Sequence, residues 1–380
     1  MAEELLIHSY LREMVKMSAS DMFMTVGCPP SMRVSGRIVT MDVPAFEKAD
    51  LKVLLENMLG DDQWDEFEST LELNFALALP EGHRFRVSLF HQKGELGMVT
   101  RMIKSSIPTF EELTLPPIYS DFIMGKRGLL LMVGATGSGK STSLASMLDY
   151  RNTHGDGHVL TIEDPIEYFH EHKGCIITQR EVGVDTYSYG MALKNALRQS
   201  PDVIMIGEIR DRETMDNAIL FCETGHLVVA TLHANNSNQA VERILNFFPE
   251  ELHRQILQTL SNNLRAVISQ RLVENTRKGR SLAYEIMINE GLVKNLIEEG
   301  KIKELKEIME KNRDRGMITF DQCLYELLGR KVITTETALR EADNASNLRL
   351  RINQSRSLGQ SPTASPGGSK RPVRTDAQDF

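Results

Sequence analysis

Short runs of apolar residues, separated by polar and helix-like segments, recur through the middle of the chain. They lie at Leu129–Val133, His158–Ile162, Val203–Ile206 and Leu227–Thr231. Continuous apolar runs of this length are typical of strands that are buried on both faces of a parallel sheet. The pattern predicts an α/β domain with a mostly parallel central sheet, which we place at residues 125–353.

The N-terminal part of the chain shows a different pattern. Apolar residues at helical spacing open it, namely Leu6, Tyr10, Leu11, Met14, Val15 and Met17. Met32–Val43 predicts a hairpin and Asp50–Leu59 predicts a helix. In Arg84–Leu89 polar and apolar residues alternate, as on a half-buried strand, and Leu96–Ile103 is expected to return beside it. These elements predict an α+β domain over residues 1–104.

Breaks and polar stretches surround the second domain. Residues 105–124 contain Pro116-Pro117, and we interpret them as a linker. Residues 354–380 are rich in Ser, Pro and Gly and poor in apolar residues, which predicts a disordered tail. Leu292–Lys311, inside the domain, is rich in Lys and Glu and predicts one solvated amphipathic helix.

A glycine-rich loop follows the first apolar run and matches G-x-x-x-x-G-K-[ST]. In this pattern backbone N–H groups cradle phosphate, the lysine reaches the β- and γ-phosphates and the hydroxyl binds Mg²⁺. The loop residues are Gly134, Ala135, Thr136, Gly137, Ser138, Gly139, Lys140, Ser141 and Thr142. Because strand, loop and helix signals occur in order, we prefer this interpretation to a glycine-rich turn without a ligand. The loop predicts ATP and Mg²⁺ as cofactors, with Lys140 on phosphate and Ser141 on the metal.

Two carboxylates follow predicted strands and are candidates for catalysis. Glu208 comes after Val203–Ile206, and Glu163 comes after His158–Ile162. Because ligands bind at the carboxyl ends of strands in such sheets, Glu208 is placed to orient the attacking water and Glu163 to support Mg²⁺. Gly207 stands where an aspartate usually supports the metal. A structural ion pair is the alternative for both carboxylates.

Two histidines bracket the last apolar run. His226 precedes it and His233 follows it, so the side chains belong to opposite ends and faces of a strand. A shared metal site is therefore disfavoured. His233, at the ligand-binding end, is a candidate sensor of the γ-phosphate, with a structural histidine as the alternative.

Composition narrows the class further. The 380 residues carry a formal charge of −8 and no strong basic block in the folded part, which disfavours a nucleic-acid motor. No stretch approaches the roughly 18 apolar residues of a membrane span, and Met1–Lys16 lacks a secretory signal's apolar core. The cysteines contain no C-x-x-C pair. We expect a cytoplasmic protein without a nucleic-acid partner, membrane span or zinc site.

Further motifs accompany the phosphate loop. They are Ala19-Ser20-Asp21, Gly27–Arg33, Thr161–Glu167, Gly207–Asp211, Thr224–Ala234 and Asp343–Ile352. In these motifs, and over residues 4–353, the chain resembles the type IV pilus retraction ATPases of the PilT and PilU type, within the hexameric secretion ATPases. Thr161–Glu167 corresponds to that family's aspartate box, Gly207–Asp211 to its Walker B motif and Thr224–Ala234 to its histidine box.

The resemblance implies a PAS-like N-terminal domain followed by a RecA-like P-loop ATPase domain, assembled as a homo-hexamer. It implies that ATP binds between the domains and that a neighbouring subunit completes the site. N-terminal arginines reach the phosphates in this family, and Arg86 and Arg101 are the candidates, because a guanidinium can neutralise charge on the transferred phosphoryl group. Surface arginines on a sheet are the alternative.

The resemblance also implies a role in pilus disassembly and twitching motility. The protein would work at the cytoplasmic face of the inner membrane, with the pilus platform protein as a partner. The four-cysteine zinc element of extension and secretion members is missing, which favours the retraction branch.

One stretch departs from that branch. Retraction members carry an Ala-Ile-Arg-Asn-Leu-Ile-Arg-Glu stretch, whereas Leu292–Glu299 reads Leu-Val-Lys-Asn-Leu-Ile-Glu-Glu. Lys294 keeps the charge of an arginine without its geometry, and Glu298 reverses a charge. We therefore predict a PilU-like accessory ATPase that assists a principal retraction ATPase. A ring subunit that mainly binds partners, and an extension or secretion ATPase, remain as alternatives.

Overall fold

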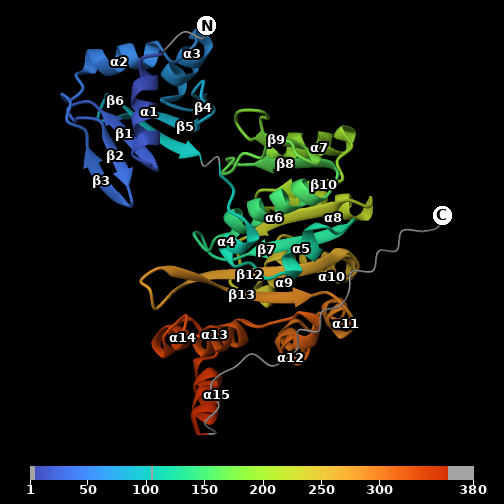
Figure 1. Cartoon of the computed structure of the whole chain (residues 1–380). Helices are drawn as coiled ribbons and strands as arrows, with labels where there is room; N and C mark the ends of the chain where they lie inside the picture. The colour runs from blue at the N-terminus through green and yellow to red at the C-terminus, as the bar shows by residue number, and fades with distance from the viewer. Residues whose placement is uncertain (1–4, 104–105, 358–380) are drawn as a thin grey trace. The chain divides into compact units, whose positions relative to one another are not determined.

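The computed structural model describes residues 5–103 and 106–357 (Figure 1). Two compact units make up the chain. The first contains the residues up to Ile107 with Thr161–Lys173 and Ile177–Asn195, and the second contains Pro108–Leu160, Gly174–Ile176 and the residues from Ala196 on. This division cuts through the segment predicted as the second domain, so the predicted boundaries at residues 104, 125 and 353 stay a prediction.

The N-terminal residues of the first unit form an antiparallel sheet with helices. The sheet has six strands in the order β3-β2-β1-β6-β5-β4. The elements are α1 (Ile7–Lys16), β1 (Asp21–Thr25), β2 (Ser31–Val34), β3 (Arg37–Thr40), α2 (Lys48–Glu56), α3 (Asp61–Thr70), β4 (Glu72–Ala78), β5 (Arg84–Gln92) and β6 (Glu95–Ile103). The predicted α+β architecture, the β2–β3 hairpin and the return of β6 beside β5 are confirmed, while α3 and β4 were not predicted.

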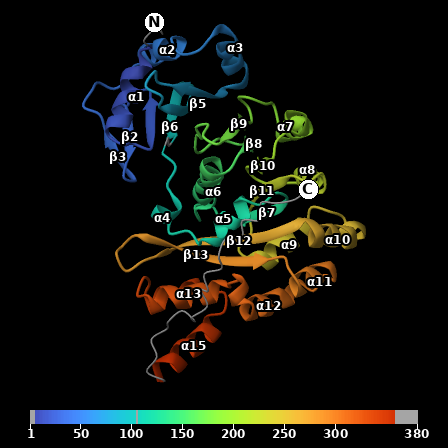
Figure 2. The same cartoon turned by 45° about the vertical axis from the view of Figure 1, so that its right-hand side comes forward.

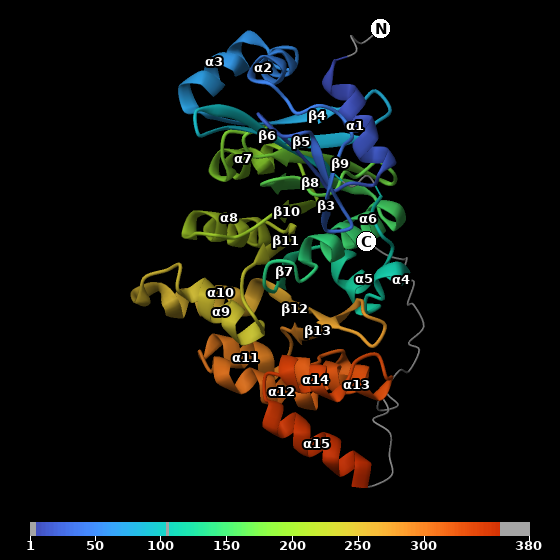
Figure 3. The ribbon, with the colours of Figure 1, turned by 90° about the vertical axis from the view of Figure 1, so that its left-hand side faces the viewer.

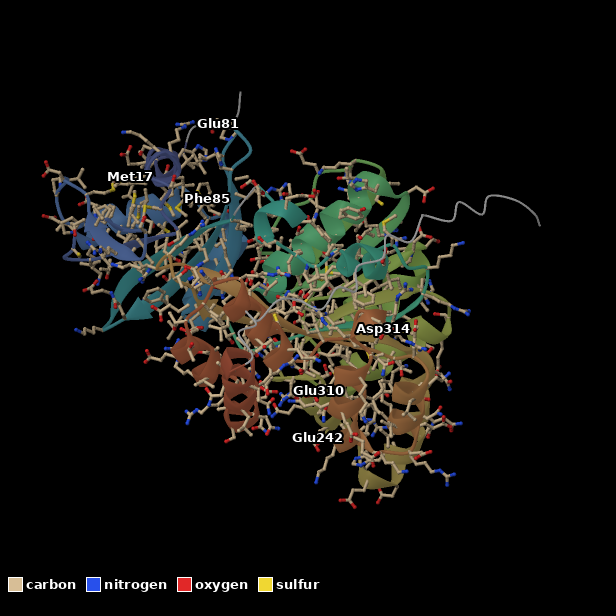
Figure 4. The ribbon with its side chains drawn as sticks, turned by 60° about the horizontal axis from the view of Figure 1, so that its bottom comes forward. Met17, Glu81, Phe85, Glu242, Glu310 and Asp314 are labelled. Atoms are coloured by element: carbon tan, nitrogen blue, oxygen red, sulfur yellow. The ribbon has the colours of Figure 1, made fainter. Side chains whose placement is uncertain are left out.

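The core of this sheet domain is covered by one face of α1. Ile7 and Leu11, one helical turn apart, are fully buried. Leu6, the residue before the helix, is 55% exposed, so the predicted stripe was wrong at this residue. Phe85 of β5 is fully buried in the same core and Met17 is partly buried against it (Figure 4).

A second, mixed sheet has seven strands in the order β13-β12-β7-β11-β10-β8-β9. Its strands are β7 (Gly128–Val133), β8 (Gly157–Glu163), β9 (Cys175–Glu181), β10 (Val203–Ile206), β11 (Leu227–Leu232), β12 (Leu264–Glu274) and β13 (Arg280–Ile288). Strands β10, β11, β7 and β12 pair in parallel, and β13 is antiparallel to β12. All four apolar runs became strands, as predicted, whereas β9, β12 and β13 were not foreseen.

Helices cover both faces of the parallel strands. They are α4 (Phe110–Leu113), α5 (Ile118–Ile123), α6 (Lys140–His154), α7 (Tyr189–Ala196), α8 (Arg212–Glu223), α9 (Ser237–Leu245) and α10 (His253–Asn263). Figure 3 shows α5 and α6 on one side of the sheet and α8, α9 and α10 on the other. The segment predicted as a linker contains α4 and α5, both of which pack on α6.

The chain then continues in helices beyond β13 (Figure 2). They are α11 (Leu292–Glu298), α12 (Leu305–Lys311), α13 (Phe320–Gly329), α14 (Thr335–Glu341) and α15 (Ala345–Ser357). The single helix predicted over Leu292–Lys311 is wrong, because Gly300, with φ of +72°, separates α11 from α12. Helix α15 reaches into the predicted tail, and residues 358–380 of that tail lie outside the described residues. Of the helices in the described part, none is long and apolar enough to cross a membrane.

Candidate nucleotide site

The phosphate loop connects β7 to α6, as the sequence predicts. Gly134, Gly137 and Gly139 have φ of +152°, +76° and +91°, a region that side chains disfavour. A Cβ at Gly134 would also lie 2.5 Å from the Ser138 Oγ and 2.6 Å from the Gln270 carbonyl oxygen. The loop therefore requires glycine at its first position both for backbone conformation and for space.

The polar groups of the loop fit a phosphate ligand. Lys140 Nζ donates to the carbonyl oxygens of Gly134 at 2.8 Å and Ala135 at 3.0 Å, so the ammonium group lies over the loop. The buried Ser138 Oγ has no hydrogen-bond partner within the part of the chain that the structure describes. An ammonium group and an unsatisfied hydroxyl within one nest of backbone N–H groups suit a triphosphate.

A buried polar cluster supports the first turn of α6. Ser143, in that turn, exchanges hydrogen bonds of 3.2 and 2.9 Å with the side-chain amide of Gln270 on β12. The Gln270 amide also donates to the hydroxyl of Tyr119 at 3.4 Å. All three side chains are almost completely buried. Sequence reasoning missed this cluster because β12 itself was not predicted.

Glu208 and His233 meet beyond the ends of neighbouring strands. The Nε2 of His233 lies 3.2 Å from Glu208 Oε1. Strands β10 and β11 pair in parallel with Ile206 opposite Ala230. Thr231 of β11 binds the segment 207–209 that follows β10. Its hydroxyl donates to the Gly207 carbonyl, and its own carbonyl accepts from Ile209 N–H at 2.9 Å. The register of two parallel strands thus brings together two residues that the sequence proposed separately.

Two further residues of the Gly207–Asp211 motif have roles that the sequence did not indicate. Arg210 Nε donates to Glu208 Oε2 at 2.7 Å. The Asp211 carboxylate accepts from Thr214 N–H at 2.8 Å and caps α8. The ion pair named as the alternative for Glu208 is therefore present, and it leaves the carboxylate 18% exposed.

A cavity of about 540 Å³ joins the loop to the histidine segment. Its lining residues are Gly134, Ala135, Thr136, His233, Ala234, Asn235, Gln239, Glu242, Arg243 and Asn246. The lining thus combines residues of the phosphate loop with polar residues of α9. The cavity is large enough for a phosphate group and its water, next to the Glu208–His233 pair.

Glu163, at the end of β8, has a different environment. Its Oε1 accepts hydrogen bonds from the Thr161 hydroxyl at 2.7 Å and the Gln179 amide at 3.2 Å. Burial raises the pKa of this carboxyl, the two donors lower it and the charges of Glu167 and Glu181 raise it, so that together they bring the pKa to about 7. Both bonds go to Oε1, so Oε2 is the atom that would face a cation. In the described part of the chain, no group of three or more His, Cys, Asp or Glu residues is arranged to hold a metal.

The two candidate arginines form a pair across strands β5 and β6. Arg86 lies directly opposite Arg101 in the antiparallel register. Arg101 Nε donates to Asp21 at 2.7 Å, and Arg33 also pairs with that carboxylate at 3.2 Å. Burial alone would raise the pKa of Asp21, but the hydrogen bonds from Arg101 and Ser20 and the charges of both arginines lower it. The Ala19-Ser20-Asp21 motif thus anchors Arg101 to its own sheet.

The remaining candidates are His226 and three residues of the first unit. His226 bonds to the Thr224 hydroxyl at 3.0 Å and to the Phe221 carbonyl at 3.1 Å, so it closes the turn before β11. Glu163, Arg86 and Arg101 belong to the first unit and the loop to the second. Their roles at the nucleotide stay a prediction.

The fold and the loop define the class, a P-loop ATPase built on a RecA-like, mostly parallel sheet. Residues 3–287 match the family described as "Type II/IV secretion system protein". The chain belongs to this family and is an ATPase of the PilT and PilU type.

Three similar proteins show how far the likeness extends. "Type IV pilus ATPase PilU" of Pseudomonas aeruginosa is 51% identical over 343 residues, which cover 90% of this chain and 90% of that protein. "Type IV pilus retractation ATPase PilT" of the same organism is 40% identical over 87% of this chain and 96% of that protein. The crystal structure of the pilus retraction motor PilT with bound ADP superposes with a TM-score of 0.85 at 38% identity, covering 92% of this chain and 100% of that chain. The predicted fold class is therefore confirmed.

Proposed function

We propose that this chain is a Mg²⁺-dependent ATPase that assists the retraction of type IV pili, in the manner of a PilU-like accessory motor. The contact between Glu208 and His233 beside the phosphate loop is the observation that carries the catalytic part. The identity of 51% with PilU, over nine-tenths of both chains, supports the cellular part.

The residues divide the work of hydrolysis. The loop backbone and Lys140 bind the β- and γ-phosphates, and Ser141 and the Oε2 of Glu163 are the proposed ligands of Mg²⁺, which neutralises phosphate charge. Glu208 orients the attacking water and accepts its proton, since a carboxylate at the end of a parallel strand faces the ligand. His233 holds Glu208 and responds to the γ-phosphate. Arg86 is the better candidate for the phosphates, because Arg101 is already bound to Asp21.

Assembly belongs to the same proposal. We expect a homo-hexamer in which a neighbouring subunit completes each ATP site and closure on ATP drives movement. The partners are a principal retraction ATPase and the platform protein of the pilus machine at the inner membrane. The protein acts from the cytoplasmic side, without a nucleic-acid partner.

The test is the rate of ATP turnover per chain as protein concentration rises, with Lys140→Ala as the blank. A rate that rises cooperatively and then levels supports a ring whose sites are completed by neighbours. A rate at the blank's level at every concentration, with the principal retraction ATPase absent or present, rejects the proposed activity.

The second candidate is a ring subunit that mainly binds partners. It is favoured by α11, where Leu292, Asn295, Glu298 and Glu299 are exposed while Val293, Leu296 and Ile297 are buried. Four positions differ from the stretch of the retraction members. Of these, Leu292 and Glu298 are exposed, Lys294 is half-buried and Val293 is buried, so a partner can contact the reversed charge at Glu298. Retraction in cells that contain this ATPase but lack the principal one would reject this candidate.

A further inference from the structure

A charged cluster lies outside the phosphate loop, at the turn between α14 and α15. The carboxylate of Asp343 accepts from Arg271 Nη2 at 2.6 Å through one oxygen and from Lys306 Nζ through the other. Asp343 N–H also donates to the Asp321 carboxylate of α13 at 2.8 Å. One residue therefore ties the turn to β12, α12 and α13. It is the first residue of the Asp343–Ile352 motif, for which hydrolysis itself offers no role.

Arg271 is fixed on all sides. Its Nη1 donates to the Glu341 carbonyl at 2.7 Å, and its Nη2 donates to the Asn235 carbonyl at 3.3 Å as well as to Asp343. The guanidinium lies 3.9 Å from the centre of the Phe320 ring. Its side chain is only 23% exposed. A planar group with several donors suits this position, which a lysine ammonium group cannot match.

The cluster reaches the catalytic histidine through the loop 233–236. Asn235 and Asn236 follow His233 by two and three residues. The Asn236 amide donates to Asp343 at 3.4 Å, while its oxygen accepts from Gln239 N–H at 3.0 Å and caps α9. Asn235 and His233 also line the cavity beside the phosphate loop. The loop is thus held at two successive residues by the Arg271–Asp343 pair.

We propose that Arg271 is a positioning residue for ATP hydrolysis, which holds loop 233–236 so that His233 stays on Glu208 and which connects this loop to the C-terminal helices through Asp343. The inference rests on the proposed function. A displacement of His233 by about 1 Å is enough to lower turnover by up to about 10²-fold, whereas the hydrogen bonds of Arg271 described above go to Glu341, Asn235 and Asp343 and not to the phosphate loop.

The first experiment separates positioning from general stability. Arg271→Lys and Arg271→Gln are compared with Arg340→Gln, which changes an exposed arginine whose side chain pairs with the carboxylates of Glu341 and Glu274. We expect both Arg271 variants to lower kcat about tenfold or more with KM for ATP changed less than about twofold, and Arg340→Gln to change neither. A rise in KM at unchanged kcat would overturn the proposal.

Repeating the comparison in a variant that lacks His233 tests whether Arg271 acts through this histidine. In His233→Ala the histidine that Arg271 positions is gone, so Arg271→Lys should lower kcat no further. If Arg271→Lys lowers kcat by the same factor in both backgrounds, Arg271 acts independently of His233 and the proposal fails. Arg271→Lys keeps the charge and carries the test if Arg271→Gln does not fold.

Hydrogen exchange gives a readout that does not require turnover. In Arg271→Lys the amides of residues 233–240 should exchange faster than in the wild type, with α6 unchanged as the internal control. Unchanged exchange at residues 233–240 rejects the clamp even if the enzyme is active. Absent turnover in the wild type with faster exchange in the variant would reject the proposed function and leave the clamp supported.

Discussion

Glu208 and Glu163 were proposed as site residues by the same rule, and the structure gives them opposite surroundings. Glu163 is the last residue of β8, and Glu208 lies just beyond the end of β10 in the same sheet. Glu208 is bound by Arg210 and His233, both of which can carry positive charge. Glu163 is bound by a hydroxyl and an amide, which carry none, and is more deeply buried.

The difference lies in how each carboxylate is stabilised. Burial without a cation raises the pKa of Glu163 to about 7, because neutral donors offset only part of the cost of desolvation. Position at the end of a strand therefore does not by itself decide which groups bind a carboxylate. One partner of each carboxylate is a near neighbour in the chain, Arg210 or Thr161. The other partner, His233 or Gln179, comes from another segment. Glu163 is suited to gain its charge when a cation arrives, and Glu208 to keep a fixed orientation.

The largest expected effect is on catalysis by Glu208. Glu208→Gln should bind ATP normally but hydrolyse it about 10²–10³-fold more slowly, because the amide cannot accept the proton of the attacking water. Single-turnover rates and nucleotide-binding titrations measure the two parts. The exposed Glu213→Gln, on the neighbouring helix α8, is the matched control. Turnover within twofold of the wild type would remove Glu208 from this role.

The next effect concerns the protonation of Glu163. Its pKa is raised from 4.5 to about 7 in the folded state, so the folded protein prefers the neutral, protonated carboxyl. The stability that this protonation gives is fully present below pH 4.5 and is lost as the pH rises through 7. Glutamine does not ionise, so Glu163→Gln should not lose this stability. The free energy of unfolding of the variant, minus that of the wild type, should therefore rise by up to about 3 kcal/mol from pH 5 to pH 8 in the absence of Mg²⁺. Denaturant unfolding in EDTA measures it.

Glu213→Gln again serves as the control for that experiment, with no comparable dependence on pH. A gain for Glu163→Gln that is equal at both pH values would show that the carboxylate is not held in its neutral form. The contrast between the two carboxylates would then be lost.

A smaller effect is expected from the donors of Glu163. Thr161→Val keeps the shape of the side chain but removes the hydroxyl that donates to Oε1 at 2.7 Å. The charged carboxylate loses this bond, so the variant should be destabilised by about 1–2 kcal/mol more at pH 8 than at pH 5. Thermal unfolding at the two pH values measures it. A loss of stability that is larger at pH 5 than at pH 8 would mean that the Thr161 hydroxyl stabilises the neutral carboxyl of Glu163 and not its charged form.

The smallest effect on stability is expected at Arg210. Its side chain is 54% exposed, and exposed ion pairs contribute only about 0–1 kcal/mol. Arg210→Gln should therefore lower the free energy of unfolding by less than about 1 kcal/mol, and less still in 0.5 M salt, as measured by urea denaturation. A loss of several kcal/mol would mean that the pair of Glu208 and Arg210 behaves as a buried ion pair. The contrast between the surroundings of Glu208 and Glu163 would then be smaller than the structure indicates.

Sequence patterns predicted the strands in which consecutive residues are nearly all apolar and nearly all buried. Strands β7 and β11 are apolar except for Thr231 and buried except for Gly128, so their runs were visible. Strand β12 was missed, because it carries Gln270 and Arg271 among apolar residues. Gln270 is fully buried only because Ser143 and Tyr119 satisfy its amide. A pattern that counts polar residues as exposed cannot predict such a strand.

The phosphate loop shows what the sequence determined by itself. Its ligand class follows from residues that are adjacent in the chain, since a glycine-rich loop before a helix forms an anion site from its own backbone N–H groups. Only the tertiary structure decided that His233 contacts Glu208, that Asp343 holds Arg271 and that Gln179 donates to the buried Glu163. Each of these depends on strand register, burial and contacts between segments distant in the chain, and these are properties that no local pattern contains.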